Sequence, residues 1–144
     1  MKRLVASVSL VAVIAFALTA VSFAGSRSTI WSAKLTSAQE FPKQVVKNTA
    51  ANGAFTATLS GTKLKFKLTF AKLTGSATMA HIHLGAMGVS GKILVTLCTP
   101  CKSPVTGTVT ANTAVQKDFT KHLLYVNVHT AKNPNGEIRG QLAG

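Results

Sequence analysis

Alternation of apolar and polar side chains over short segments is the feature that most restricts the fold of this chain. It is strictest in residues 63–70, where leucine and phenylalanine alternate with lysine and threonine. Successive side chains of a β-strand point to opposite faces of a sheet, so the segment predicts a strand with one buried and one solvated face. The side chains expected inside are Leu64, Phe66 and Phe70, and those expected outside are Lys63, Lys65 and Lys67.

Most of the remaining chain shows the same short, β-branched segments punctuated by glycine and proline. Further strands are expected at 30–35, 53–59, 80–84, 93–97, 105–110, 123–129 and 137–142. Residues 112–121 are expected to form a loop or one short helical turn. No segment sustains the 3.6-residue apolar period of a helix. About eight short strands with regular turns predict an all-β fold, an antiparallel β-sandwich of the Greek-key, immunoglobulin-like or superoxide-dismutase-like type.

The first 24 residues have the pattern of a secretory signal peptide. A basic start at residues 1–3 precedes an uncharged apolar run at 4–20, and Ser22 and Ala24 supply small residues before Gly25. This pattern predicts cleavage on export, which leaves a single domain at 25–144 and no membrane span. An uncleaved membrane anchor is the alternative. We expect a secreted or periplasmic protein.

The charge balance of the chain is strongly basic. The chain has 16 Lys and Arg against 3 Asp and Glu, and Lys2 and Arg3 leave with the signal peptide. Such a charge favours a polyanion such as an acidic cell-surface polymer, while an unidentified protein partner and a role in solubility alone stay open. The lysines are spread along the chain, and no tract alternates basic and aromatic residues as a nucleic-acid-binding surface would, so specific nucleic-acid binding is not expected. The shortage of carboxylates argues against a glycosidase dyad and against a calcium or magnesium site, and no catalytic residue is identified.

Three of the four histidines carry the clearest chemical signal. His81-Ile82-His83 places two imidazoles on one face of a strand, and His129 ends the strand-like run at 124–129. If the two strands are neighbours, three imidazoles converge, which is a suitable ligand set for copper or zinc. The alternative is that these histidines are polar, hydrogen-bonded residues on a sheet surface.

The cysteine pair Cys98-Thr99-Pro100-Cys101 is expected to form a disulfide that braces a loop. An exported chain matures in an oxidising compartment, where two cysteines at this spacing pair. A metal contact and redox catalysis are the alternatives. A redox role requires a helix N-terminus after a strand, which an all-β chain does not supply.

The mature chain resembles the CHRD domain, a module named for chordin that also occurs in many exported microbial proteins. The resemblance rests on three segments in the family's order. They are Leu35 with Ser37-Ala38-Gln39-Glu40-Phe41-Pro42, Ala80-His81-Ile82-His83-Leu84-Gly85 with Gly88, Gly91 and 93–97, and Leu124 to Thr130 followed by Asn133 to Leu142. The resemblance implies a β-sandwich and secretion, and it implies no agreed catalytic activity.

Two functions therefore stay open. The first is an exported, non-enzymatic binding or structural module of unknown partner. The second is a copper- or zinc-binding protein with a three-histidine surface site at His81, His83 and His129. Copper/zinc superoxide dismutase offers a weaker analogy, because it is a β-sandwich with an H-x-H strand and a later ligand histidine. Its fourth copper histidine, zinc ligands and electrostatic loop have no counterpart here, and a shared fold does not transfer function.

Overall fold

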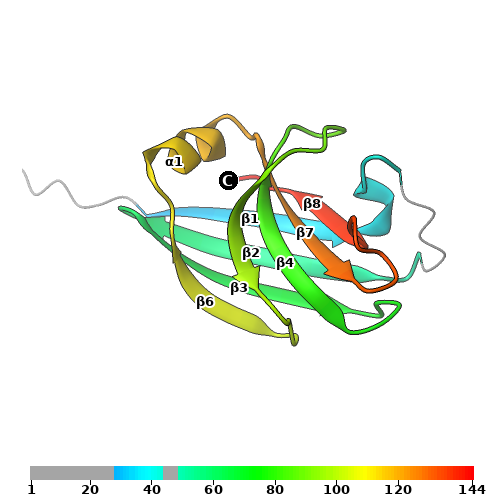
Figure 1. Ribbon diagram of the computed structural model, residues 1–144. Helices are drawn as coiled ribbons and strands as arrows, with labels where there is room; N and C mark the ends of the chain where they lie inside the picture. The colour runs from blue at the N-terminus through cyan, green and yellow to red at the C-terminus, as the bar shows by residue number, and fades with distance from the viewer. Residues whose placement is uncertain (1–27, 44–48) are drawn as a thin grey trace, which may run out of the picture.

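The chain folds into one continuous antiparallel sheet of eight strands (Figure 1). The computed structural model describes residues 28–43 and 49–144, so the expected signal peptide and its cleavage point lie outside the described residues. The strands are β1 (Thr29–Thr36), β2 (Asn52–Ser60), β3 (Lys63–Ala71), β4 (Ala77–Leu84), β5 (Ile93–Cys98), β6 (Val105–Thr110), β7 (Leu124–Thr130) and β8 (Ile138–Gln141). Their lateral order is β5-β4-β7-β8-β1-β2-β3-β6.

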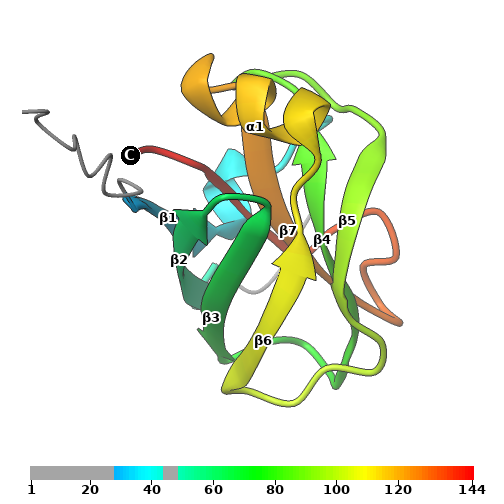
Figure 2. The ribbon, with the colours of Figure 1, turned by 90° about the vertical axis from the view of Figure 1, so that its left-hand side faces the viewer.

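The sheet curls until its edge strands β5 and β6 approach each other, which makes a nearly closed barrel (Figure 2). The expected all-β class is confirmed, but the fold is not clearly the expected sandwich of two sheets. Strand β8 pairs with β7 on one side and reaches β1 through Thr36 and Arg139, and a further bridge joins Ser32 to Ala143. These links join strands β5, β4, β7 and β8 to strands β1, β2, β3 and β6 in one continuous sheet. Alternation reveals which face of a strand is buried and not which strands pair, so the sequence did not distinguish the two arrangements.

All eight expected strands are present, and their bounds agree with the expectation to within a few residues. In β3, Leu64 and Phe66 are buried and the lysines are exposed, as the alternation predicted. Phe70 is only partly buried, because it lies near the end of β3 where the barrel opens.

A two-turn helix, α1 (Thr113–Thr120), replaces the expected loop or single turn. The side chain of Asn112 caps its first turn by accepting a hydrogen bond from the Val115 amide at 3.0 Å. Val115 and Phe119, four positions apart, point into the end of the barrel, where Phe119 meets Trp31 at a centroid distance of 5.0 Å. The cap and the i, i+4 apolar pair were the sequence signals for this helix.

Strand β7 is buried over its whole length and on both faces. Its alternating side chains Leu124, Val126 and Val128 belong to the core inside the barrel. The opposite face is also covered, because loops fold back over β4, β7 and β8. This burial outside the barrel creates a second, polar layer on which the candidate site is built.

A disulfide joins Cys98 to Cys101 in the connection between β5 and β6, as expected. A search of residues 28–43 and 49–144 finds no helix with the length and apolar character needed to cross a membrane.

Candidate metal centre

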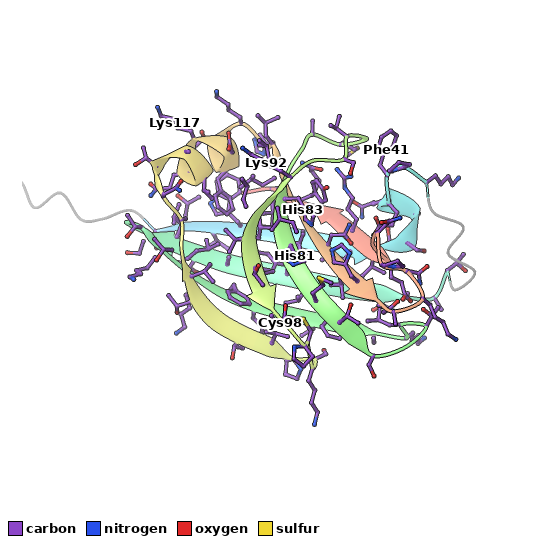
Figure 3. All side chains as sticks on the ribbon, in the orientation of Figure 1. Phe41, His81, His83, Lys92, Cys98 and Lys117 are labelled. Carbon is purple, nitrogen blue, oxygen red and sulfur yellow. A yellow bond between two sulfur atoms is a disulfide. The ribbon has the colours of Figure 1, made fainter. Side chains whose placement is uncertain are left out.

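His81, His83 and His129 come together on the outer face of the β4–β7 pair. The two strands are antiparallel neighbours, and the register sets Met79 opposite His129 and His81 opposite Asn127. One nitrogen of each imidazole lies within 4.8 Å of the other two. Nδ1 of His81 is 3.2 Å from Nε2 of His129. Figure 3 shows His81 and His83 along β4. The expected convergence of the three side chains is therefore confirmed.

The three histidines are buried, with exposed fractions of 4% for His81, 7% for His83 and 6% for His129. The expectation of a surface site was wrong in this respect. The loop between β4 and β5 and the turn between β7 and β8 fold over the polar face and contribute hydrogen-bond partners there. Strand alternation gives the direction of a side chain and carries no information on what later packs over it.

Backbone carbonyl groups fix the tautomers of two of the histidines. Nδ1 of His83 donates to the Gly91 carbonyl at 3.0 Å, and Nδ1 of His129 donates to the Pro134 carbonyl at 3.0 Å. A carbonyl only accepts, so both rings carry their proton on Nδ1 and present the Nε2 lone pair to the cluster. Nε2 of His83 is buried and has no hydrogen-bond partner among residues 28–43 and 49–144. This orientation is the one that metal-binding histidines adopt.

Gly91 allows the β4–β5 loop to close over His83. A Cβ atom at this position would overlap the Leu84 carbonyl, so only glycine permits this approach of the backbone. The Gly91 amide donates to the Tyr125 hydroxyl at 3.2 Å while its carbonyl receives the His83 proton. One glycine therefore holds both the loop and the imidazole.

The three imidazoles are neutral at physiological pH. Burial, reinforced by the neighbouring His129 and His83, lowers the pKa of His81 from 6.5 to about 4. Burial also lowers the pKa of His83 and the pKa of His129, although each backbone hydrogen bond opposes the shift. Neutral imidazoles bind a metal ion without a net loss of protons. Because Nε2 of His129 can only accept, Nδ1 of His81 is the donor of their hydrogen bond, and its proton must move to the other ring nitrogen before Nδ1 of His81 can be a ligand.

The ring of Tyr125 stacks on His83, and the guanidinium group of Arg139 packs against the ring of Tyr125. The ring of His83 lies 4.9 Å from the ring of Tyr125 at an interplanar angle of 11°, and the guanidinium carbon of Arg139 lies 3.5 Å from the Tyr125 centroid. Nη2 of Arg139 donates to the Ala86 carbonyl at 2.9 Å, which ties the β4–β5 loop to β8. The stack limits rotation of the His83 ring.

Glu40 and Asn127 extend the polar layer beside His81. Nδ2 of Asn127 donates to Oε2 of Glu40 at 3.3 Å, and Glu40 is 4% exposed. Burial raises the pKa of Glu40 to about 7, against the opposing effects of the Asn127 hydrogen bond and the Arg139 charge. Gly136, at φ +128°, packs against this pair, and a side chain there would collide with both groups.

Glu137 fixes the turn that supplies the Pro134 carbonyl to His129. Its carboxylate receives hydrogen bonds of 2.6–3.0 Å from Thr74, Thr130 and Asn133. Burial alone would raise the pKa of Glu137, but these hydrogen bonds outweigh it and the pKa is lowered. A charged and fully bonded Glu137 therefore keeps the turn, and with it the tautomer of His129, in place.

The sequence did not single out these supporting residues. Alternation along β7 could have identified Tyr125 and Asn127 as neighbours of the site, because they lie on the same face of the strand as His129. Glu40 gave no such signal, since it follows the short 3-10 helix η1 (Ser37–Gln39) rather than lying in a strand.

The donor set defines the chemistry available to the cluster. Among the described residues, this grouping consists of imidazoles with no carboxylate, which suits copper or zinc and does not suit calcium or magnesium. Two nitrogens bound to one tetrahedral ion at about 2.0–2.1 Å lie about 3.3 Å apart. The 3.2 Å separation of the His81 and His129 nitrogens is close to this value.

These features define a β-barrel-like domain with a buried three-histidine cluster on the outside of its sheet. Residues 31–142 match the CHRD domain, so the chain belongs to the CHRD domain family. The match runs from β1 to β8 and includes all three histidines. Neither the curated proteins nor the solved structures contained a match to this chain.

Proposed function

We propose that this protein is an exported binding module that holds a copper or zinc ion with His81, His83 and His129. The observation that carries the proposal is the buried Nε2 of His83, which has no hydrogen-bond partner in the described part of the chain, in a group whose three ligand nitrogens lie within 4.8 Å of one another. Leaving a buried acceptor without a partner costs about 1–3 kcal/mol, which a bound metal ion would recover. Hydrogen bonding alone accounts for the His81–His129 contact but leaves His83 unexplained.

Met79 favours copper over zinc. It lies on the same face as His81 and His83, since Ala80 and Ile82 between them belong to the core, and the register pairs it with His129. Side chains directly opposite on adjacent strands are neighbours, with Cβ atoms about 4.5–5.5 Å apart. A thioether is a soft donor that suits copper(I), which also accepts neutral imidazoles.

Burial of the ligands favours binding rather than catalysis. Catalytic metal sites keep a coordination position open to water or substrate. All three histidines here are under the β4–β5 loop and the β7–β8 turn, which shield them from solvent. The function supported best is therefore retention of a metal ion by a non-enzymatic module.

Titration of metal-free protein is expected to give one copper or zinc ion per chain, with an unusual pH dependence. Protons compete with metal for the histidine nitrogens, and an ordinary histidine competes below a pKa near 6.5. Because the pKa of each ligand is lowered, to about 4 for His81, the affinity should fall at a lower pH than it would for a site of ordinary histidines. A midpoint at 6.5, or no metal uptake at neutral pH, would contradict the proposal.

Export is the second part of the proposal, and it is supported by the pattern of residues 1–24 and by the disulfide at Cys98 and Cys101. Protein recovered from the medium or the periplasm should begin near Gly25. Its mass without reduction should be lower by two hydrogens than its reduced mass. Intact-mass measurement checks both. Retention of residues 1–24, or alkylation of the cysteines without a reductant, would overturn this part.

A further inference from the structure

The outer face of β2, β3 and β6 carries an ordered array of lysines and hydroxyl groups. The strand register places each exposed lysine of β3 between a hydroxyl side chain on either side. The rows, from one end of β3 to the other, are Ser60–Lys63–Thr110, Thr58–Lys65–Thr108 and Thr56–Lys67–Thr106. Residues two apart along a strand are about 6.6–7 Å apart, so the rows are regularly spaced.

Protection of a sheet edge does not explain these lysines. Lysine on an edge strand discourages pairing with another chain. Strand β3 lies inside the sheet between β2 and β6, and the edges are β5 and β6. The exposed side chains of edge strand β6 are threonines without charge.

No aspartate or glutamate side chain offsets the charge of this face. The whole chain has 3 acidic residues. Glu40 and Glu137 are buried in the polar layer on the other side of the barrel, and Asp118 belongs to α1. Three like charges about 7 Å apart are within the Debye length of about 8 Å at physiological salt, so their repulsion is only partly screened. An anion bound along the rows would remove that repulsion.

The array also lines an open groove of about 570 Å³. The groove crosses the strands at the rows of Lys65 and Lys67, and Ile30, 67% exposed, lies at its margin. A groove that offers cations flanked by hydroxyl groups complements a chain that carries anionic groups and hydroxyl or ether oxygens.

We propose that this face, defined by Lys63, Lys65 and Lys67 with their flanking hydroxyl rows, binds a linear anionic polysaccharide. The lysines pair with its sulfate or carboxylate groups, and the threonines hydrogen-bond to its oxygens. Binding of single-stranded nucleic acid uses aromatic side chains for stacking, and none of the face's exposed residues is aromatic. Interfacial membrane binding needs a broad apolar surface, whereas Ile30 is the single large exposed apolar side chain at this groove.

The test compares two triple variants that lose the same charge. The face variant is Lys63→Thr, Lys65→Thr and Lys67→Thr, in which threonine preserves the β-propensity of the strand. The matched control is Lys117→Gln, Lys121→Gln and Lys132→Gln, all exposed and outside the array. Affinity for heparin and for polygalacturonate is measured against salt concentration, so that the two polymers distinguish sulfate from carboxylate recognition. Far-UV circular dichroism and the midpoint of urea denaturation report, independently of metal binding, that each variant is folded.

The affinity of the face variant should be at least tenfold lower than that of wild type. The plot of log affinity against log salt should become shallower by about 2, as for the loss of three phosphate-type contacts that contribute about 0.7 each. The control should keep its slope. Equal losses in both variants would show that net charge alone drives binding and would overturn the proposal. Stronger binding of wild type to vesicles with anionic lipid than to either polymer would replace it with a membrane surface. If these measurements show that the face variant is unfolded, the single substitution Lys65→Glu is expected to show the same loss in a folded protein.

Discussion

Replacement of His83 with alanine is expected to weaken metal binding by more than about 100-fold. Loss of a residue that merely orients a ligand already costs 10–100-fold in metal affinity, and His83 is a direct ligand in the proposed site. Its Nε2 is the buried nitrogen without a protein partner, and its Nδ1 proton is held by the Gly91 carbonyl. Equivalent losses are expected for His81→Ala and His129→Ala. Isothermal titration of metal-free protein with copper and zinc measures the change.

His122→Ala is the matched control for these variants. His122 is exposed and lies outside the three-histidine cluster, and its ring packs against Trp31 at a centroid distance of 6.1 Å. It should bind metal as wild type does. If any of the three cluster variants binds copper and zinc as tightly as wild type, the metal centre is rejected. The rows of lysine and threonine on β3 and its neighbours would be unaffected by that result.

Replacement of Phe66 with alanine should lower the free energy of unfolding by about 3–5 kcal/mol. Phe66 is 4% exposed and stacks on Phe55 at a centroid distance of 5.9 Å. The residue opposite it on β6 is Gly107, and the ring occupies the space where a side chain of Gly107 would lie. Since Gly107 has no side chain to fill the resulting cavity, the cost should be at the upper end of this range. Urea denaturation measures it.

Lys65→Ala provides the comparison, because Lys65 is adjacent to Phe66 and points to solvent. Its effect on the free energy of unfolding should stay within about 0.5 kcal/mol. Similar losses at the two positions would mean that the two faces of β3 are assigned wrongly.

The facing of the strands followed from the sequence, as β3 illustrates. A strand has a fixed two-residue period, so the order of leucine, phenylalanine and lysine in 63–70 determines which side chains are buried. The same rule places His81 and His83 on one face of β4. The disulfide between Cys98 and Cys101 was also predictable, since three positions separate the two residues and the chain has no other cysteine.

The candidate site depended on information that alternation does not carry. His81 and His129 are 48 positions apart, and their meeting requires β4 and β7 to be neighbours. The H-x-H pattern suggested that the three histidines converge, and the pairing of β4 with β7 in the structure brings them together. The supporting contacts of Glu40 and Arg139 likewise join distant segments, with 87 positions between Glu40 and Asn127 and 53 between Ala86 and Arg139.

The sequence by itself determined the all-β class, the position and facing of the strands, the family resemblance and the disulfide. Only the tertiary structure decided that the sheet is one nearly closed barrel and that the histidine face is buried under loops. The physical reason is the range of the interactions. The direction of a side chain is set by the local backbone, whereas lateral strand order and the packing of loops over a face are set by contacts between residues far apart in the chain.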